Sequence, residues 1–469
     1  MIDTSRGLTP VGLAPKIERL WALSAEKIEA VEKSCPAGSP SPVFTVKGRY
    51  TAQGWTEWTQ GFQYGSAILQ FDATDERRFL DSGRRLTVEV MAPHLTHFGV
   101  HDHGFNNVST YGNLRRLMLE GRFAPDPWER RFYELALKVS GAVQAHRWTA
   151  TSGGGGFIHS FNGPHSLFVD TIRSCRALAL SHMLGHRLME EQDRSVSLLE
   201  RLVLHLRATA TYSVYYGRGR DVYDTPDQRG RTAHEALFNP TNGEFRCPST
   251  QQGYSPFSTW TRGLAWALCG FAEQLEFLRS RTDAELDSLG GRGAIETVLL
   301  DAAQATGEFY LTHTPPDGVP YWDTGAPGLQ RLRSADRPAD PFGDDEPVDS
   351  SAAAIAAQGL LRLGRYLGPK RSGRRARTYW QAGLRILDTL LDEPYLSTKP
   401  GHQGLILHSV YHRPRGWDHV PSRGGVPRGE SSMWGDYHAR EAALLVQRIA
   451  RGATELTFFG PPPHLEARR

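Results

Sequence analysis

The apolar residues of this chain recur mostly at helical spacing, which constrains its fold more than any other feature. In residues 13–32, for example, Ile17, Leu20, Trp21 and Ile28 fall on one helix face. The same pattern predicts helices over residues 168–184, 194–212, 259–279, 294–311, 350–367, 374–391 and 436–451. Runs with a period of two, such as residues 404–410, are few and short. The sequence therefore predicts an all-α fold.

Long loops rich in Gly, Pro, Asp, His and Trp separate the predicted helices. Such loops in a compact domain are usually functional. Paired helices with one elaborated loop per pair indicate a toroid of α-hairpins, with an α-solenoid as the alternative. We see no linker, so we expect one large domain over residues 41–459. An N-terminal segment and first helix (1–40) should pack on it, and a Pro-rich tail (460–469) should follow. We expect the tail and the first dozen residues to be loosely held.

Charge and cysteine usage exclude several classes of protein. A formal net charge of +3 on 469 residues, without a long basic run, argues against nucleic-acid binding. No run of 18 apolar residues predicts a membrane span, and no N-terminal leader is evident. The four cysteines lack CxxC spacing, so we expect reduced, buried thiols and a cytoplasmic protein.

Residues 249–266 (STQQGYSPFSTWTRGLAW) combine aromatic, amide and guanidinium side chains in one loop and the helix after it. Trp260 and Trp266 offer flat faces for stacking on sugar rings, and Arg262 can fork onto a carboxylate. Gln252 both donates and accepts hydrogen bonds, so it can bridge a hydroxyl and a carboxylate. This mixture predicts a site for an acidic sugar. In the alternative, both tryptophans are core residues and Arg262 pairs with a buried carboxylate.

Asp102 lies in a loop bracketed by Gly99 and Gly104, which suits a backbone that approaches a ligand closely. His101 and His103 flank this carboxylate. Two histidines at this spacing on a strand can share a metal ion, so a metal site is one interpretation. No further ligand motif of similar quality accompanies them, and we favour a substrate loop.

Asp170 is the second carboxylate that its context singles out. One interpretation is an ordinary helix-start Asp that complements the helix dipole. However, Phe168 and Val169 precede Asp170 and Ile172 follows it, which indicates an apolar setting. Such a setting predicts a raised pKa for the Asp170 carboxyl, as a general acid requires.

Several segments, in order along the chain, resemble motifs of the unsaturated glucuronyl hydrolases of glycoside hydrolase family 88. They are WTQGF (58–62), HDHGF (101–105), VDT (169–171), His234 in GRTAHEALF, QGY…STWTRGLAW (252–266), PPDGVPYWD (315–323), DSSAAAIAAQGLL (349–361) and WGDYHAREA (434–442). The resemblance runs from about Trp58 to Glu441. It implies an (α/α)6 barrel, a toroid of six α-hairpins, as the catalytic domain.

The resemblance also implies a reaction. These enzymes remove a 4,5-unsaturated uronic acid from the non-reducing end of oligosaccharides left by polysaccharide lyases, by hydrating the C4=C5 vinyl ether. Asp170 would act as general acid and base, and Asp102 would hold the sugar and tune Asp170. The implied substrate-binding residues are Trp58, His101, His234, Gln252, Trp260, Arg262 and Trp266. We expect no metal, no organic cofactor, and a monomer or homodimer.

The chain departs from the family pattern beside Asp170. Ile172, Arg173 and Ser174 stand where Met and Asn are common. Arg173 could face the site and lower the pKa of Asp170, or it could turn away and pair elsewhere. Three other functions stay open: an unsaturated rhamnogalacturonyl hydrolase, an (α/α)6 epimerase that uses His101 and His234, and an inactive sugar-binding homologue.

Overall fold

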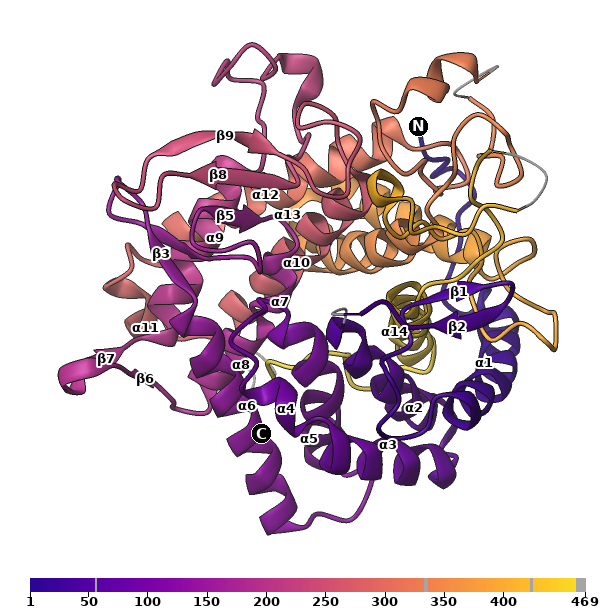
Figure 1. The fold of residues 1–469 in the computed structure, drawn as a ribbon, viewed down its shortest axis with the longest axis horizontal. Coiled ribbons are helices and arrows are strands. Elements are labelled where there is room, and N and C mark those ends of the chain that lie inside the picture. Colours follow the sequence, from indigo (N-terminus) through magenta and orange to yellow (C-terminus); the bar gives the residue numbers. More distant parts are fainter. Residues whose placement is uncertain (55–56, 333–335, 422–424, 461–469) are drawn as a thin grey trace.

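The computed structural model describes residues 1–54, 57–332, 336–421 and 425–460, and its helices form two concentric layers (Figure 1). The tail predicted over residues 461–469 lies outside the described residues. The inner layer consists of α2 (Gln60–Thr74), the π-helix η2 (Gly104–Gly112) with α5 (Asn113–Leu119), α7 (Thr171–Ser174) with α8 (Arg176–Met183), α10 (Thr261–Arg279), the first half of α13 (Ser350–Leu390) and α14 (Met433–Ala450).

The inner helices close into a ring. α2 packs against η2, η2 against α7 and α8, α7 against α10, α10 against α13, and α13 against α14. α14 then packs back against α2. The predicted (α/α)6 barrel is therefore confirmed. Inner helices are buried nearly all round, as in α10, where every residue from Thr261 to Leu278 is buried.

The outer layer consists of α1 (Ala14–Ser34), α3 (Arg77–Val90), α6 (Pro127–His146), α9 (Leu198–Tyr212), α12 (Arg292–His313) and the second half of α13. These helices are amphipathic: α3, for example, buries Phe79, Leu80 and Leu86 against α2 and turns its charged residues outward. The short helices α4 (Ala92–Leu95) and α11 (Asp283–Asp287) join neighbouring elements.

α13 folds back on itself as a helical hairpin. Gly368 has a φ of +57°, a left-handed conformation that favours glycine and turns the chain. A Cβ on Gly364 would lie 2.9 Å from the Ala376 carbonyl oxygen, and one on Gly383 would lie 3.0 Å from the Ala357 carbonyl oxygen. The two halves therefore run antiparallel in close contact, in agreement with the two helices predicted over 350–367 and 374–391.

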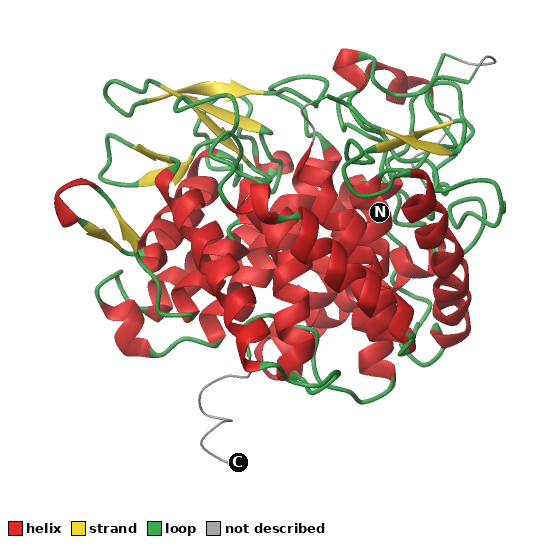
Figure 2. Ribbon diagram, turned by 60° about the horizontal axis from the view of Figure 1, so that its bottom comes forward, coloured by secondary structure: helices red, strands yellow, loops and turns green. Residues whose placement is uncertain are grey.

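Most of the short strands and long loops gather at one rim of the helical ring (Figure 2). The antiparallel pairs are β1 (Phe44–Val46) with β2 (Arg49–Thr51), β3 (Trp148–Ala150) with β4 (Gly156–Ile158), and β6 (Leu188–Met189) with β7 (Ser195–Val196). A three-stranded sheet has the order β5 (Ser166–Phe168), β8 (Glu235–Phe238), β9 (Phe245–Ser249). Short 3-10 turns lie in the connecting loops: η1 (Glu57–Thr59), η3 (Glu191–Asp193), η4 (Pro226–Gln228), η5 (Pro327–Arg331) and η6 (Arg413–Arg415).

Three local predictions were wrong. Phe168, the predicted helix start, ends β5 (166–168), because the backbone of this segment pairs with β8. α10 begins at Thr261 rather than at residue 259, because the Thr259 backbone N–H and C=O bond to Thr324. The first residues are held in place, since the Ile2 N–H donates to the Leu311 carbonyl.

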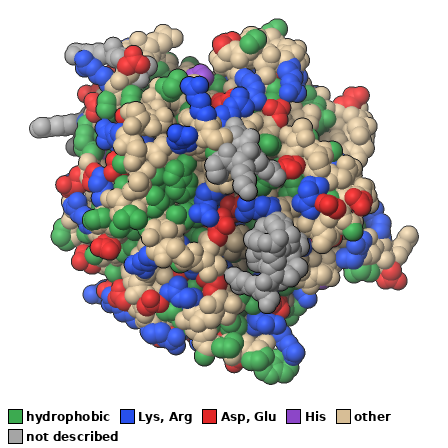
Figure 3. Space-filling view, turned by 180° about the vertical axis from the view of Figure 1, so that it is seen from behind, with side chains coloured by type: hydrophobic (Ala, Val, Ile, Leu, Met, Phe, Trp, Pro, Cys, Tyr) green, Lys and Arg blue, Asp and Glu red, His purple; other side chains and the backbone are tan. Residues whose placement is uncertain are grey.

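Positive and negative side chains are interspersed on the molecular face seen from behind in Figure 3, without a continuous basic area. None of the described helices is long and apolar enough to cross a membrane. All four cysteines are free thiols. Cys175 and Cys269 are buried as predicted, but Cys35 is half-buried and Cys247 is exposed because it lies on the outer strand β9.

Candidate active site

A pocket opens where the inner helices begin. Its lining residues are Trp58, Val100, His101, Asp102, Phe105, Phe161, Phe168, Asp170, Gln251, Gln252, Trp260, Arg262, Trp266, Tyr411, His412, Arg415 and Trp417. Eight of the nine predicted site residues therefore line one cavity. The ninth, His234, lies directly behind it, with its ring 4.5 Å from each of the Phe168 and Trp260 rings.

His101 bridges the two predicted catalytic carboxylates. Its Nε2 lies 3.2 Å from Asp170 Oδ1 and 3.6 Å from Asp102 Oδ1. Asp170 immediately precedes α7, and its side chain does not cap that helix. Asp102 precedes η2, and its carbonyl oxygen accepts a hydrogen bond from the Phe105 N–H in the first turn of that helix. All three side chains are buried, so their charges interact strongly with each other.

The surroundings push the pKa values of the two carboxyls apart. The pKa of Asp170 is lowered, whereas the sequence predicted that it would be raised. Burial raises the pKa of Asp170, but the hydrogen bond from His101 and the charges of His101, His234 and Arg262 outweigh burial and lower it. Burial raises the pKa of Asp102, with the Asp170 charge adding to it. Burial lowers the pKa of His101, but the two carboxylates raise it above 6.5.

His103 is not part of this cluster. Its Nδ1 lies 3.2 Å from Ser140 Oγ, and its Nε2 lies 3.2 Å from the His97 carbonyl oxygen. Both ring nitrogens are thus engaged away from His101. In the part of the chain that the structure describes, no group of three or more His, Cys, Asp and Glu side chains is arranged to hold a metal ion.

His234 is held as a single tautomer. Its Nδ1 accepts the backbone N–H groups of Gln251 at 2.9 Å and Gln252 at 3.3 Å. An Nδ1 that accepts cannot carry the proton, so the proton sits on Nε2. Burial lowers the pKa of His234 to about 4, which keeps the ring neutral at pH 7. Its Nε2 is buried and has no hydrogen-bond partner among the described residues.

Arg262 is buried and joined to other parts of the protein. Its Nη2 donates to Gln252 Oε1 at 2.5 Å and to the Tyr411 carbonyl at 2.8 Å. Its Nη1 donates to the Val410 carbonyl and lies 3.5 Å from Asp349 Oδ2. Arg262 therefore lines the pocket and also pairs with a buried carboxylate, which was the alternative interpretation of its segment.

Aromatic rings form a continuous wall beside the carboxylates. The Trp58 ring stacks on Trp434 at 5.1 Å, and the Arg262 guanidinium lies between the Trp434 and Trp260 rings at 4.7 and 4.6 Å. On the other side, Trp266 packs against Phe105 at 4.8 Å. Trp260 and Trp266 are thus both buried core residues and pocket walls, whereas Trp58 is half-buried.

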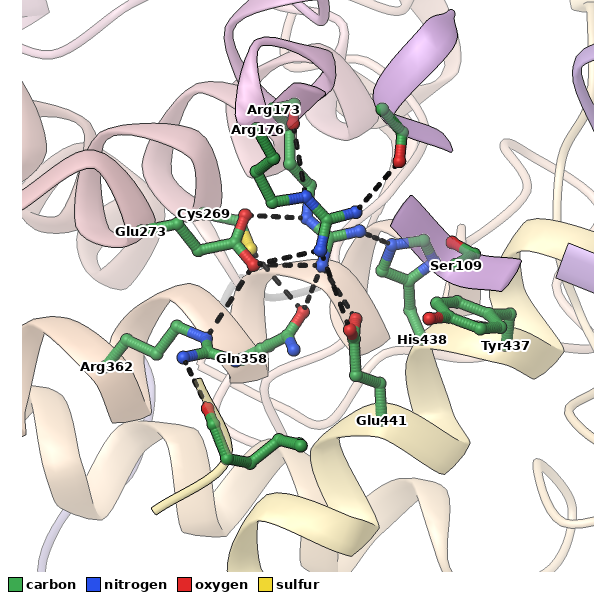
Figure 4. Close-up of polar contacts among 12 residues, drawn as sticks. Ser109, Arg173, Arg176, Cys269, Glu273, Gln358, Arg362, Tyr437, His438 and Glu441 are labelled. Carbon is green, nitrogen blue, oxygen red and sulfur yellow. Dashed lines mark hydrogen bonds and ion pairs between the residues drawn. The ribbon is translucent and has the colours of Figure 1, made fainter. Parts of the chain in front are cut away.

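Arg173 turns away from the pocket into the barrel axis. Figure 4 shows it among charged side chains of α8, α10, α13 and α14. Its guanidinium donates to Glu273 at 3.1 Å and to Glu441 at 2.6 Å. Ser174 points the opposite way: its Oγ donates to the His101 carbonyl at 2.6 Å and accepts from Gly104 N at 3.0 Å. The two unusual residues therefore fix the Asp170 segment from both sides.

The sequence interpretation missed the late loop that lines the pocket. This loop contributes Tyr411, His412, Arg415 and Trp417, which lie in none of the quoted motifs. Their aromatic content was the available signal, since long loops between helices were expected to build the site. Trp434, which packs against the pocket residues Trp58 and Arg262, was also missed, although it lies in a quoted motif.

No protein-family model matches the chain. It is 27% identical over 417 residues to the unsaturated glucuronyl hydrolase of Bacillus sp. (strain GL1), covering 87% of this chain and 89% of that protein. It is 25% identical to an unsaturated chondroitin disaccharide hydrolase of Streptococcus pyogenes serotype M1, covering 86% of this chain and 84% of that protein.

A crystal structure of an unsaturated glucuronyl hydrolase specific for heparin matches with a TM-score of 0.69 and 18% identity. The match covers 94% of this chain and 99% of that chain. At that identity the likeness shows the fold. Together with the sequence relatives, it confirms the predicted resemblance to the unsaturated glucuronyl hydrolases.

Proposed function

We propose that this protein is a glycoside hydrolase that releases a 4,5-unsaturated uronic acid from the non-reducing end of lyase-generated oligosaccharides. The observation that carries the proposal is the Asp102–His101–Asp170 cluster at the base of an aromatic-walled pocket. Aromatic faces suit a sugar ring, and buried carboxylates suit proton transfer to it. The relatives named above carry the same activity in their names.

In the proposed reaction Asp170 donates a proton to C4 of the vinyl ether. The resulting oxocarbenium-like cation is stabilised by the carboxylate that this transfer leaves at Asp170. Water adds at C5, and its proton passes to Asp170, so the enzyme regains its starting state. The hemiketal formed at C5 then opens and releases the remaining sugar. Asp102 holds the sugar hydroxyls and tunes the pKa of Asp170.

The lowered pKa of Asp170 raises the question of where its proton comes from. In the free site the two carboxylates raise the pKa of His101, and its Nε2 lies 3.2 Å from Asp170 Oδ1. An anionic uronate that enters the pocket raises the pKa of both His101 and Asp170, because it disfavours further negative charge. We assign His101 as the group that protonates Asp170 once substrate is bound.

The other assignments belong to the same proposal. Trp58, Trp260 and Trp266 wall the sugar ring, and His234 and Gln252 lie near its carboxylate and the attacking water. Residues 41–459 form the catalytic domain, with residues 1–40 packed on it. The free thiols support a cytoplasmic location. We propose a monomer or homodimer that needs no metal or organic cofactor.

An absorbance assay tests the proposal. The C4=C5 bond of an unsaturated uronide is conjugated with its carboxylate and absorbs in the ultraviolet, and hydration removes that band. The purified protein should remove the band from at least one lyase-generated disaccharide of chondroitin, hyaluronan, heparin, ulvan, xanthan or gellan. Unchanged absorbance with all of them would refute the proposed reaction.

A further inference from the structure

We infer that Ser174 is a positioning residue for the proposed reaction, and that its hydroxyl sets the distance between His101 and Asp170. The inference rests on the proposed function, in which these two side chains exchange a proton. Ser174 is one of the residues in which the chain departs from the family pattern. It is not among the residues that line the pocket, so it acts only through the groups that it holds.

The Ser174 hydroxyl joins the two ends of the segment that carries His101 and Asp102. Its Oγ donates to the His101 carbonyl oxygen at 2.6 Å and accepts from the Gly104 N–H at 3.0 Å. The Ser174 side chain is fully buried, and a buried carbonyl or N–H group that loses its partner is costly. One hydroxyl therefore fixes the segment from His101 to Gly104 at both of its ends.

The same segment lies directly against the backbone of α7. A Cβ on Gly104 would lie 2.0 Å from the Ser174 carbonyl oxygen, so only glycine fits at this position. The close approach that Gly104 permits is thus to α7, whereas its sequence context suggested an approach to a ligand. Because α7 begins directly after Asp170, this contact joins the two segments that carry the proposed catalytic side chains.

Gln144 of the outer helix α6 supports the same arrangement. Its Nε2 donates to the His101 carbonyl oxygen at 2.8 Å and to Ser174 Oγ at 3.0 Å. A hydroxyl has one hydrogen and two lone pairs. All three are used here, because Ser174 donates to His101 and accepts from the Gly104 and Gln144 N–H groups. The hydroxyl therefore has a single orientation, and two donors hold the His101 carbonyl.

Arg173 anchors the other side of α7. Its guanidinium pairs with Glu273 of α10 and Glu441 of α14 in the barrel axis (Figure 4). α7 is a single helical turn, which is too short to be stable by itself, so its position depends on such contacts. Ser174 therefore ties the segment that carries His101 to a helix that the core already holds in place.

The distance that Ser174 maintains has an electrostatic consequence. His101 Nε2 lies 3.2 Å from Asp170 Oδ1, and the effect of each group on the pKa of the other weakens as they separate. Without the Ser174 hydroxyl the pKa of His101 should fall and that of Asp170 should rise, so the pair loses its proton at lower pH. The other charged groups that act on this pair, which the substitutions below leave in place, are Asp102, Arg147, His234 and Arg262.

The test is Ser174→Ala, assayed by the absorbance loss of an unsaturated disaccharide that the wild-type protein hydrates. We expect kcat to fall about ten- to hundredfold, because a misplacement of about 1 Å in a reacting group has an effect of that order. KM should change little, since every pocket residue is kept. The alkaline limb of kcat/KM should move to lower pH, which a loss of stability alone would not cause.

Ser181→Ala is the matched control. Ser181 of α8 is also fully buried, and its Oγ donates to the Lys138 carbonyl oxygen of α6 at 3.1 Å, away from the pocket lining. Both serine variants should unfold at lower urea concentration than the wild-type protein, because each loses a buried hydrogen bond. Only Ser174→Ala should change kcat and the pH profile.

Gln144→Met is a milder second variant, since it removes one donor to the His101 carbonyl and keeps the length of the side chain. It should shift kcat and the alkaline limb in the same direction as Ser174→Ala, by less. A Ser174→Ala protein with the kcat and pH profile of Ser181→Ala would overturn the inference. If Ser174→Ala does not fold, a wild-type kcat and pH profile in Gln144→Met would overturn it. Wild-type protein inactive on every unsaturated uronide would instead refute the proposed function.

Discussion

Replacing His101 by Gln tests whether His101 supplies a proton or only contacts the sugar. The Gln amide can still donate to Asp170, but it cannot hold a mobile proton. In the wild-type protein the proton of the His101–Asp170 pair is retained above pH 6.5, because the carboxylates raise the pKa of His101. Activity should therefore fall on the alkaline side as the pair loses this proton.

The size of the effect follows from the geometry. Protonated His101, with its Nε2 3.2 Å from Asp170 Oδ1, lowers the pKa of that carboxyl, so removing His101 raises the pKa of Asp170. In the wild-type protein the pair loses its proton at the raised pKa of His101, whereas in the variant Asp170 alone loses it at its own, lower pKa. The alkaline limb of kcat/KM should therefore move to lower pH. The variant should lose about tenfold or more at pH 7.5 and little at pH 5.

The assay is the absorbance loss of an unsaturated disaccharide, followed from pH 4.5 to 9. His103→Gln is the matched control, because His103 is equally buried but both of its nitrogens bond inside the protein. Its pKa is lowered by burial to about 3, so it carries no proton to lose in this range. An alkaline limb that stays in place in His101→Gln would refute the role of His101 as proton source.

Three further outcomes are expected. Asp170→Asn should lose about 10²–10⁴-fold in kcat with an unchanged circular dichroism spectrum, and near-normal turnover would remove Asp170 from the chemistry. Glu441→Ala should lower the free energy of unfolding by about 3–5 kcal/mol in denaturant titrations, since it leaves Arg173 partly unpaired in the core. Glu89→Ala, which breaks the exposed pair with Arg85, should cost less than about 1 kcal/mol, and equal losses would contradict the reasoning. EDTA should leave activity unchanged, and a large loss on chelation would revive the metal interpretation of His101.

The fold was accessible from the sequence where helices are amphipathic and less so where they are buried. α2 buries every residue from Gln60 to Ala73, so it has no polar face to reveal a period. α3 and α6 carry clear apolar stripes and were overlooked, which was avoidable. The prediction that a helix starts at residue 168 was wrong for a different reason. Residues 166–168 pair with a strand about 70 residues later, and no local pattern contains that information.

Within the candidate site, residue identities could be predicted but electrostatics could not. The apolar neighbours of Asp170 correctly indicated burial, which alone raises a carboxyl pKa. The opposing effect comes from His101, 69 residues earlier, and only the fold brings the two together. The same holds for Arg262, whose partner Asp349 lies on a different inner helix. In both cases the deciding partner is distant in sequence.

The direction of the inner helices adds positive potential to the pocket, which suits an acidic sugar. Trp58 precedes α2, Asp102 precedes η2, Asp170 precedes α7, Trp260 precedes α10 and Asp349 precedes α13. The N-termini of these helices therefore all lie toward the pocket, and each contributes partial positive charge there. Several such termini favour an anion over a neutral sugar while leaving the carboxylate of Asp170 free of a direct cation other than His101. The buried ion pairs of Arg173 in the barrel axis hold α7 against α10 and α14, so this convergence is fixed by the core.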